Sequence, residues 1–256
     1  MHNFKLHISP CPNDTFMFDA IINSRIDLKG MHFEVEYHDI EELNAGVLTG
    51  SADISKISCA VLPHIAHSYA LLSSGAALGR GNGPLLVRRK GDTAPIKSVA
   101  VPGEMTTANA LLKRLLPELD NRHPMLFSSI AEAVESGAVD AGVLIHEGRF
   151  VYAERNLELV ADLGLLWEQR LSLPLPLGAI VMKSSIDEQT RQRFETLLRE
   201  SITYAFAHRE ASRAFVKSHA QETADKVIES HISLFVNDFS LDLGTEGHRA
   251  IDALIL

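Results

Sequence analysis

The sequence predicts an α/β protein built from two lobes of similar plan, with a ligand cleft between them. Two stretches of nearly the same form, 50–59 and 137–148, lie 87 residues apart. In each, a glycine ends a helical pattern, an aspartate follows three residues later, and an apolar run comes next. What precedes each copy also corresponds, since strand patterns at 5–9 and 98–101 each lead into a proline-containing loop and a helix. Chance recurrence of a Gly-x-x-Asp spacing is the alternative.

Composition and charge exclude several classes of protein. The chain has 256 residues, of which 46% are hydrophobic and 22% charged, as in a globular protein that buries a substantial core. The net charge is −9 and no basic block occurs, so we expect no nucleic acid partner. No apolar run approaches the roughly 18 residues that span a membrane. Two cysteines and no signal segment predict a cytoplasmic protein.

In the first lobe we expect a strand at 5–9, a stiff loop at 10–15 and then a helix. Asn13 or Asp14 can cap that helix, and the fixed N–H groups could hold an anion; a plain helix start is the alternative. A clean alternation at 33–37 predicts a strand, and residues 39–42 form a capping box for a helix to about 49.

The next segment, 60–69, is predicted to be helical. It carries two histidines three residues apart, a spacing that a metal ion could use. Because no other metal ligand lies near them in the sequence, we expect these histidines to be surface or partly packed side chains instead. The glycine-dense stretch 75–83 lacks the spacing of a nucleotide-binding loop, so we interpret it as a hinge between the lobes. Within it, Arg80 is either a substrate contact or an exposed charge. The strand 84–87 follows.

The second lobe begins with a strand at 98–101, a Pro-Gly turn and a helix that starts at Thr106 and Thr107. Hydroxyls and free N–H groups at the positive end of a helix dipole are a natural carboxylate seat; a simple helix cap is the alternative. Further strands are expected at four places, with a short helix around Trp167 between the last two. These strands are 125–127, 141–145, 157–161 and 173–182.

The return to the first lobe gives predicted limits of 1–89 and 176–256 for the first lobe and 90–175 for the second. A cap at Ser185 and Glu188 begins a long helix, and two or three more helices complete the chain, with 237–240 as a loop.

His146 stands where the buried strand 141–145 stops, which is where open α/β sheets bind ligands. Its neighbour Glu147 points the other way in an extended segment. The remaining histidines, His231 among them, are interpreted as surface or packing residues.

Five motifs carry a resemblance to a known family. They are Ser9-Pro10-Cys11-Pro12-Asn13-Asp14-Thr15-Phe16, Ser74-Gly75-Ala76-Ala77-Leu78-Gly79-Arg80-Gly81, Val101-Pro102-Gly103 with Thr106-Thr107, Ile145-His146-Glu147-Gly148-Arg149-Phe150, and Leu173-Pro174-Leu175-Pro176-Leu177-Gly178. In this order and combination the chain, from about residue 5 to 245, resembles the 1,4-dihydroxy-6-naphthoate synthases. These enzymes convert cyclic dehypoxanthine futalosine in the futalosine route to menaquinone.

The resemblance implies a two-lobed fold like that of type II periplasmic binding proteins, acting as a carbon–carbon lyase on a small carboxylate substrate without metal or organic cofactor. It implies that His146 accepts a proton. It also implies that Lys56, Ile57 and Ser58 contact the substrate from one lobe, and Thr107 and Ala108 from the other. We add Thr106, Asn13 and Arg80 as candidate binding residues, and note that Cys59 stands where a larger, often aromatic residue is expected.

Two other functions fit the same pattern. One is a non-catalytic solute-binding protein with the same two lobes, which the missing signal segment disfavours. The other is chorismate dehydratase, the sister enzyme of the same pathway; the loop at 9–14 and His146 favour the naphthoate synthase. The sequence does not indicate an oligomeric state.

Overall fold

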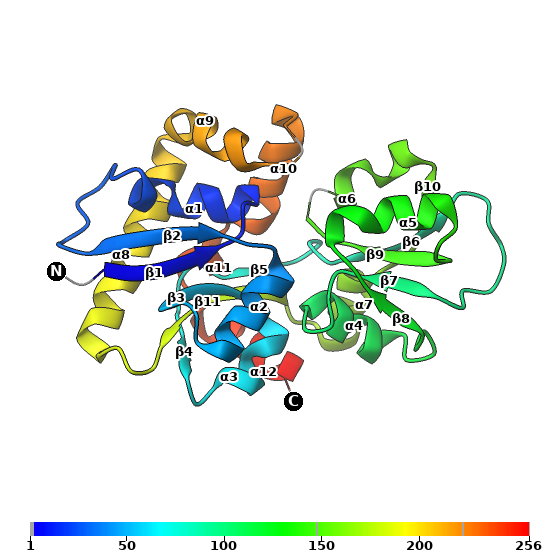
Figure 1. Ribbon diagram of the computed structural model, residues 1–256, viewed down its shortest axis with the longest axis horizontal. Coiled ribbons are helices and arrows are strands. Elements are labelled where there is room, and N and C mark those ends of the chain that lie inside the picture. The colour runs from blue at the N-terminus through cyan, green and yellow to red at the C-terminus, as the bar shows by residue number, and fades with distance from the viewer. Residues whose placement is uncertain (1–2, 147, 222, 256) are drawn as a thin grey trace.

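The structure is a computed structural model that describes residues 3–146, 148–221 and 223–255. Two sheets with their helices lie side by side in an elongated molecule (Figure 1). We call the part around the first sheet the first lobe and the part around the second sheet the second lobe. The first sheet has the order β2-β1-β3-β11-β4, with β5 paired to β11, and the second has the order β10-β6-β9-β7-β8.

The strands of the first sheet are β1 (Asn3–Ile8), β2 (His32–Tyr37), β3 (Ile54–Ser58), β4 (Tyr69–Leu71), β5 (Ala77–Gly79) and β11 (Leu175–Lys183). Those of the second are β6 (Leu85–Arg89), β7 (Val99–Val101), β8 (Arg122–Pro124), β9 (Ala141–Leu144) and β10 (Leu157–Asp162). In the first sheet β1 runs parallel to β2 and β3, and β11 is antiparallel to β3. In the second, β7 runs parallel to β8 and β9, and β6 is antiparallel to β9. The predicted α/β fold with two lobes of one plan is confirmed.

The same helices recur between corresponding strands. They are α1 (Pro12–Ile22) and α2 (Ile40–Thr49) in the first lobe, and α4 (Thr107–Leu115) and α5 (Ile130–Ser136) in the second. Both α2 and α5 end at a glycine in the left-handed region, Gly50 with φ of 73° and Gly137 with φ of 79°. At the start of α2, Asp39 and Glu42 form the predicted capping box.

The two repeated aspartates have the same structural task. Asp53 Oδ2 accepts a hydrogen bond from the backbone N–H of Lys5 at 3.0 Å, at the start of β1. Asp140 Oδ2 accepts from the backbone N–H groups of Lys97 and Ser98 at 2.8 and 2.9 Å, just before β7. Each aspartate therefore fastens the beginning of one parallel strand to the beginning of its neighbour.

The remaining helices cover the sheets and complete the first lobe. They are α3 (Leu62–Ile65), α6 (Gly148–Val151), α7 (Leu163–Leu171), α8 (Glu188–Ala207), α9 (Arg209–His219), α10 (Asp225–Phe235), α11 (Asp238–Leu241) and α12 (Gly244–Ile255). Short 3₁₀ turns occupy Cys59–Val61, Phe127–Ser129 and Tyr152–Arg155. The main apolar core of the first lobe lies where α1 and α8 pack on the sheet through Phe16, Phe18 and Phe194.

Four local predictions are wrong in detail. The strand expected at 125–127 is at 122–124, because β8 is a short edge strand whose polar sequence carries no apolar signal. Residues 60–69 divide into a 3₁₀ turn, the single-turn helix α3 and the start of β4. Asp187, not Ser185, caps α8, since its side chain accepts from the backbone N–H of Thr190. Residues 237–240 form a capped turn of helix, α11, rather than a loop.

The chain passes between the sheets at about residues 80–84. β5, within the glycine-dense stretch, still belongs to the first sheet, whereas β6 lies wholly in the second. The strand pairing therefore puts the first crossing a few residues before the predicted limit at 89, and the return lies at β11.

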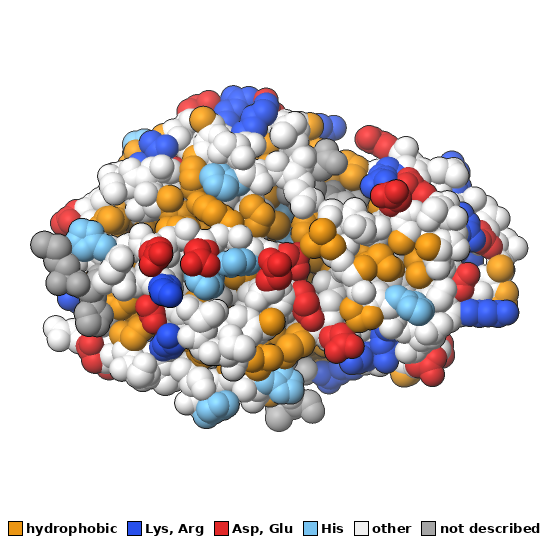
Figure 2. All heavy atoms as spheres, in the orientation of Figure 1, with side chains coloured by type: hydrophobic (Ala, Val, Ile, Leu, Met, Phe, Trp, Pro, Cys, Tyr) orange, Lys and Arg blue, Asp and Glu red, His pale blue; other side chains and the backbone are white. Residues whose placement is uncertain are grey.

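No helix among the described residues is long and apolar enough to cross a membrane. On the face shown in Figure 2, Lys and Arg side chains are interspersed with Asp and Glu. This face carries no extended basic surface of the kind that nucleic acids require.

Candidate active site

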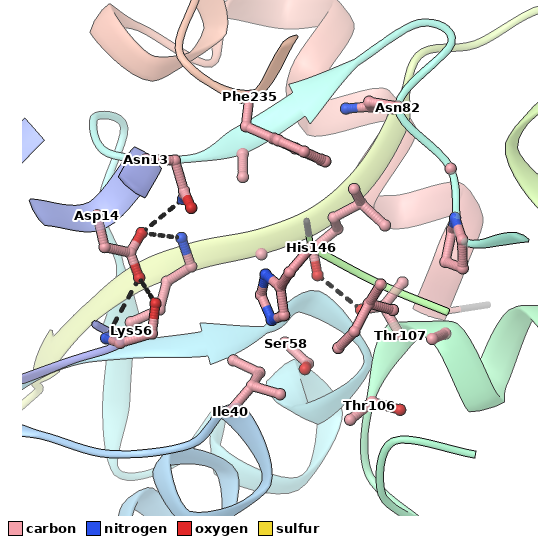
Figure 3. A pocket seen from close by; sticks show the side chains of 18 of the residues that line it. Asn13, Asp14, Ile40, Lys56, Ser58, Asn82, Thr106, Thr107, His146 and Phe235 are labelled. Carbon is pink, nitrogen blue, oxygen red and sulfur yellow. Dashed lines mark hydrogen bonds and ion pairs between the residues drawn. The ribbon is translucent and has the colours of Figure 1, made fainter. Parts of the chain in front are cut away.

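A cavity lies between the two lobes, at the carboxyl ends of β1, β3 and β9. Side chains from both lobes point into it (Figure 3). Seven of the predicted site residues line it: Asn13, Lys56, Ser58, Thr106, Thr107, Ala108 and His146. The parallel strands of the two lobes thus bring together residues that are up to 133 positions apart.

Two predicted binding residues lie elsewhere. Ile57 is fully buried and packs with Val47 and Val61 in the first lobe, because alternate residues of β3 face opposite sides of the sheet. Arg80 is half-exposed and pairs with Glu246 at 3.1 Å on the surface. Of the two readings given for Arg80, the exposed charge is the one that the structure favours.

The first-lobe wall is a buried ion pair with a closed set of hydrogen bonds. Lys56 Nζ donates to Asp14 Oδ1 at 2.6 Å, and Asn13 Nδ2 donates to the same oxygen at 2.8 Å. Ser9 Oγ donates to Asp14 Oδ2 at 2.7 Å. Asp14 is fully buried and Lys56 nearly so. Since both oxygens of the carboxylate are occupied, the aspartate serves to position Lys56 and Asn13 for the pocket.

Ser58 completes this wall with a free donor. Asn44 Oδ1 accepts from the backbone N–H of Ser58 at 2.8 Å, and Asn44 Nδ2 donates to Ser58 Oγ at 3.0 Å. Because Oγ accepts the Asn44 bond, its own proton remains available to a ligand.

The second-lobe wall holds the start of α4. Thr106 caps the helix by accepting from the backbone N–H of Asn109. Thr107 Oγ1 donates to the carbonyl of Leu177 at 2.8 Å and accepts from the backbone N–H of Ala60 at 3.2 Å. Both hydroxyls are therefore committed to the protein. Within the described residues the backbone N–H groups of Thr107 and Ala108 have no acceptor, so these amides are available to bind an anion.

The lobes also touch beside this helix. Glu41, at the start of α2, accepts from the backbone N–H of Met105 at 3.1 Å. Gly103 has a φ of 141°, and a Cβ there would meet the carboxyl group of Glu41 at 2.4 Å. Only glycine allows this close approach, so the Pro-Gly turn seen in the sequence fits the second lobe against the first.

His146 projects into the middle of the cavity, between Lys56 and Thr107 (Figure 3). It is a non-glycine residue in the left-handed region, with a φ of 52°, at the turn that follows β9. Its Nδ1 lies 3.4 Å from Sγ of Cys11, in the other lobe, and its ring packs edge-on against Phe127. Within the described residues Nε2 of His146 has no hydrogen-bond partner.

Burial lowers the pKa of His146 to about 4, and nearby Lys56 adds to this effect while Asp14 opposes it. The imidazole is therefore neutral near pH 7, with Nε2 or Nδ1 carrying a lone pair. The contact between Nδ1 and Sγ of Cys11 fits either tautomer: when Nδ1–H donates to Sγ, the lone pair is on Nε2, and when the thiol donates to Nδ1, the proton is on Nε2.

Sequence reasoning missed two residues of the wall, Arg149 and His231, and the contact between Cys11 and His146. Cys11 entered the sequence analysis through the cysteine count and the motif at 9–16, without a role in the site. Arg149 donates to the carbonyl of Gly83 at 2.8 Å and lines the cavity. His231, interpreted as a surface or packing residue, is fully buried in the wall of the cavity. Its signal was a polar residue on the apolar stripe of α10, a pattern that core histidines share.

Apolar side chains cover the rest of the cavity, including Ile40, Leu177 and Phe235. An arrangement of one apolar surface, hydrogen-bond donors and an unpaired helix start suits a flat ring system that carries a carboxylate.

The pocket does not offer a metal-ligand cluster among the described residues. The group with suitable atoms in that part of the chain is His7 on β1, Glu36 on β2 and His38 just after β2. None of these three residues lines the pocket. Cys59 is buried in the core of the first lobe and does not line the cavity. Glu147 lies outside the described residues.

Comparisons with known proteins identify the family of this chain. A family model described as menaquinone biosynthesis matches residues 4–255. A 1,4-dihydroxy-6-naphthoate synthase of Thermus thermophilus is 41% identical over 99% of this chain and 93% of its own length. A second, from Streptomyces coelicolor, is 41% identical over 96% of this chain and 89% of its own.

Solved structures give the fold. A crystal structure of a protein from Archaeoglobus fulgidus superposes with a TM-score of 0.92, at 30% identity, over 99% of this chain and 95% of that one. A Candida albicans protein described as having the generic periplasmic binding protein fold gives a TM-score of 0.72 at 12% identity, over 99% and 90% of the two chains. The periplasmic-binding-protein-like fold is therefore confirmed. By sequence and by structure, the chain belongs to the menaquinone biosynthesis family and is an enzyme of that pathway, like the 1,4-dihydroxy-6-naphthoate synthases it resembles.

Proposed function

We propose that this pocket converts cyclic dehypoxanthine futalosine to 1,4-dihydroxy-6-naphthoate, with His146 as the general base. The observation that carries the proposal is the unpaired Nε2 of a neutral imidazole in the middle of the cavity. A base must be unprotonated and within reach of the substrate before it can accept a proton. In this proposal Nδ1–H of His146 donates to Sγ of Cys11, so Nε2 carries the lone pair of the neutral ring.

The other walls have matching tasks. The free amides of Thr107 and Ala108 hold the carboxylate of the substrate at the positive end of α4. The Oγ proton of Ser58 and the remaining protons of Lys56 Nζ bind oxygen atoms of the sugar-derived part. The local donors explain how a protein with a net charge of −9 attracts an anion.

The reaction then follows from the proton transfer. Nε2 of His146 removes a proton from the bound substrate, and the spiro ring opens. The sugar-derived portion leaves as a three-carbon fragment, and formation of the second aromatic ring drives these later steps. The apolar surface around Leu177 and Phe235 keeps water from the ring while this happens.

Product formation tests the proposal. The purified protein is mixed with the cyclic substrate, with chorismate, or with neither, and the dihydroxynaphthoate is measured by mass and absorbance. We expect product from the cyclic substrate alone. Conversion of chorismate would instead identify the sister dehydratase. Tight binding of either compound without turnover would identify a solute-binding protein. The cytoplasmic location stays a prediction.

A further inference from the structure

His231 is a second imidazole in the wall of the cavity, contributed by α10. It has no exposed surface, and its ring lies nearly parallel to that of His146, with 12° between the planes and 6.1 Å between the centroids. The ring centroid of His231 also lies 4.6 Å from that of Phe235. These contacts fix the ring in one orientation, so the roles of its two nitrogens can be worked out.

The proton of His231 is on Nε2. This nitrogen lies 2.9 Å from Oδ1 of Asn13. Asn13 must present its amide NH₂ to Asp14, because both oxygens of that carboxylate only accept, and so its oxygen faces His231. An amide oxygen only accepts, and therefore Nε2 donates. Burial, with His146, Lys56 and Arg149 nearby, lowers the pKa of His231 well below its usual value, which keeps the ring neutral.

Neutrality with a proton on Nε2 leaves a lone pair on Nδ1. Within the described residues this nitrogen is buried and has no hydrogen-bond partner. A buried acceptor without a partner destabilises the folded protein, and native proteins keep few of them. In a residue that lines a ligand cavity, the missing donor is most simply supplied by the ligand.

We propose that Nδ1 of His231 accepts a hydrogen bond from a hydroxyl group of the bound substrate. His231 is then a substrate-orienting residue, held by the buried chain from Lys56 through Asp14 and Asn13. Lys56 and Ser58 supply donors to oxygen atoms of the substrate, and His231 supplies an acceptor. Together they select a ligand that carries hydroxyl groups beside its ring system. This inference rests on the proposed function for the identity of the substrate.

Two substitutions separate the nitrogens. In His231→Gln, the longer amide can place its NH₂ where Nε2 stood and keep the bond to Asn13, but no acceptor remains at the Nδ1 position. In His231→Asn, the shorter amide places an oxygen near Nδ1 and loses the donor to Asn13. If Nδ1 binds the substrate, the KM of His231→Gln should be about tenfold higher than the KM of His231→Asn.

The reverse order, with His231→Gln near normal and His231→Asn impaired, would show a purely structural role and overturn the inference. Nitrogen NMR of the unsubstituted protein, labelled in its histidines, provides a second measurement that needs no variant to fold. We expect His231 as the neutral form protonated on Nε2, with the Nδ1 resonance shifting when the cyclic substrate is added. A proton on Nδ1, or a resonance that does not move at saturation, would also overturn it.

The two proposals fail differently. If the unsubstituted protein leaves the cyclic substrate unchanged yet the Nδ1 resonance shifts on adding it, only the proposed reaction is wrong. If turnover is normal and the resonance is unmoved, only the role of His231 is wrong.

Discussion

The two lobes are alike at the beginnings of their central strands and differ at the ends. Gly50 and Gly137 end helices in the same conformation, and the aspartates that follow fasten neighbouring strands in the same way. With the same offset, Cys59 corresponds to His146. The thiol is buried in the first lobe, and burial raises its pKa to about 12, whereas burial lowers the pKa of the imidazole to about 4. We therefore expect the shared half of the repeat to be scaffold and the divergent half to carry the proposed chemistry.

The largest effect on kcat should come from a substitution at His146, where the two lobes differ. His146→Asn removes the base and keeps a smaller polar side chain, so kcat should fall by about 10²- to 10⁴-fold with little change in substrate affinity. Cys59→Ala, at the equivalent position of the other lobe, is the matched control and should keep kcat. Steady-state kinetics and a binding titration measure both. A fully active His146→Asn variant would end the comparison in its present form.

The pH dependence of kcat/KM sharpens the comparison between the two lobes. With a pKa of about 4, His146 stays unprotonated down to that pH, so kcat/KM should be level above about pH 5 and fall about tenfold per unit below 4. The folded state binds fewer protons than the unfolded state between about 4 and 6.5. The free energy of unfolding should therefore decline as the pH falls through that window. An acid limb centred near 6.5 would contradict the burial of the ring.

A smaller effect is expected at the contact between the lobes. Thr107→Val deletes the hydroxyl that bonds to Leu177 and Ala60, which disturbs the free amides beside it, and should raise KM by about tenfold. Thr107→Ser keeps the hydroxyl and is the control. If KM of the valine variant matched that of the serine variant, the carboxylate seat would have to be placed elsewhere.

The smallest effect on catalysis belongs to the shared half. Asp53→Ala and Asp140→Ala each remove hydrogen bonds to backbone N–H groups and should reduce the free energy of unfolding by about 1–3 kcal/mol, with kcat nearly unchanged. Denaturant unfolding and the product assay measure the two quantities. Loss of kcat in one variant alone would break the division between scaffold and chemistry.

The sequence could predict whatever is local. The glycine helix ends, the Asp39 capping box and a histidine directly after a buried strand are read from neighbouring residues, and the structure has all three. The contact between Cys11 and His146, and the place of His231 beside them, join residues 85 or more positions apart. No periodicity encodes such packing. The choice between a substrate contact and an exposed charge at Arg80 could not be made from the sequence for the same reason, since its partner Glu246 lies in the last helix.

Thr107 has a consequence for the catalytic cycle. The residue whose amide begins the anion seat also bonds through its hydroxyl to both Leu177 and Ala60 of the opposite lobe. In the proposed reaction, widening the gap between the lobes to release the product would break these two hydrogen bonds and move the free amides away from the product carboxylate. Lobe opening and loss of the carboxylate contact would then occur together.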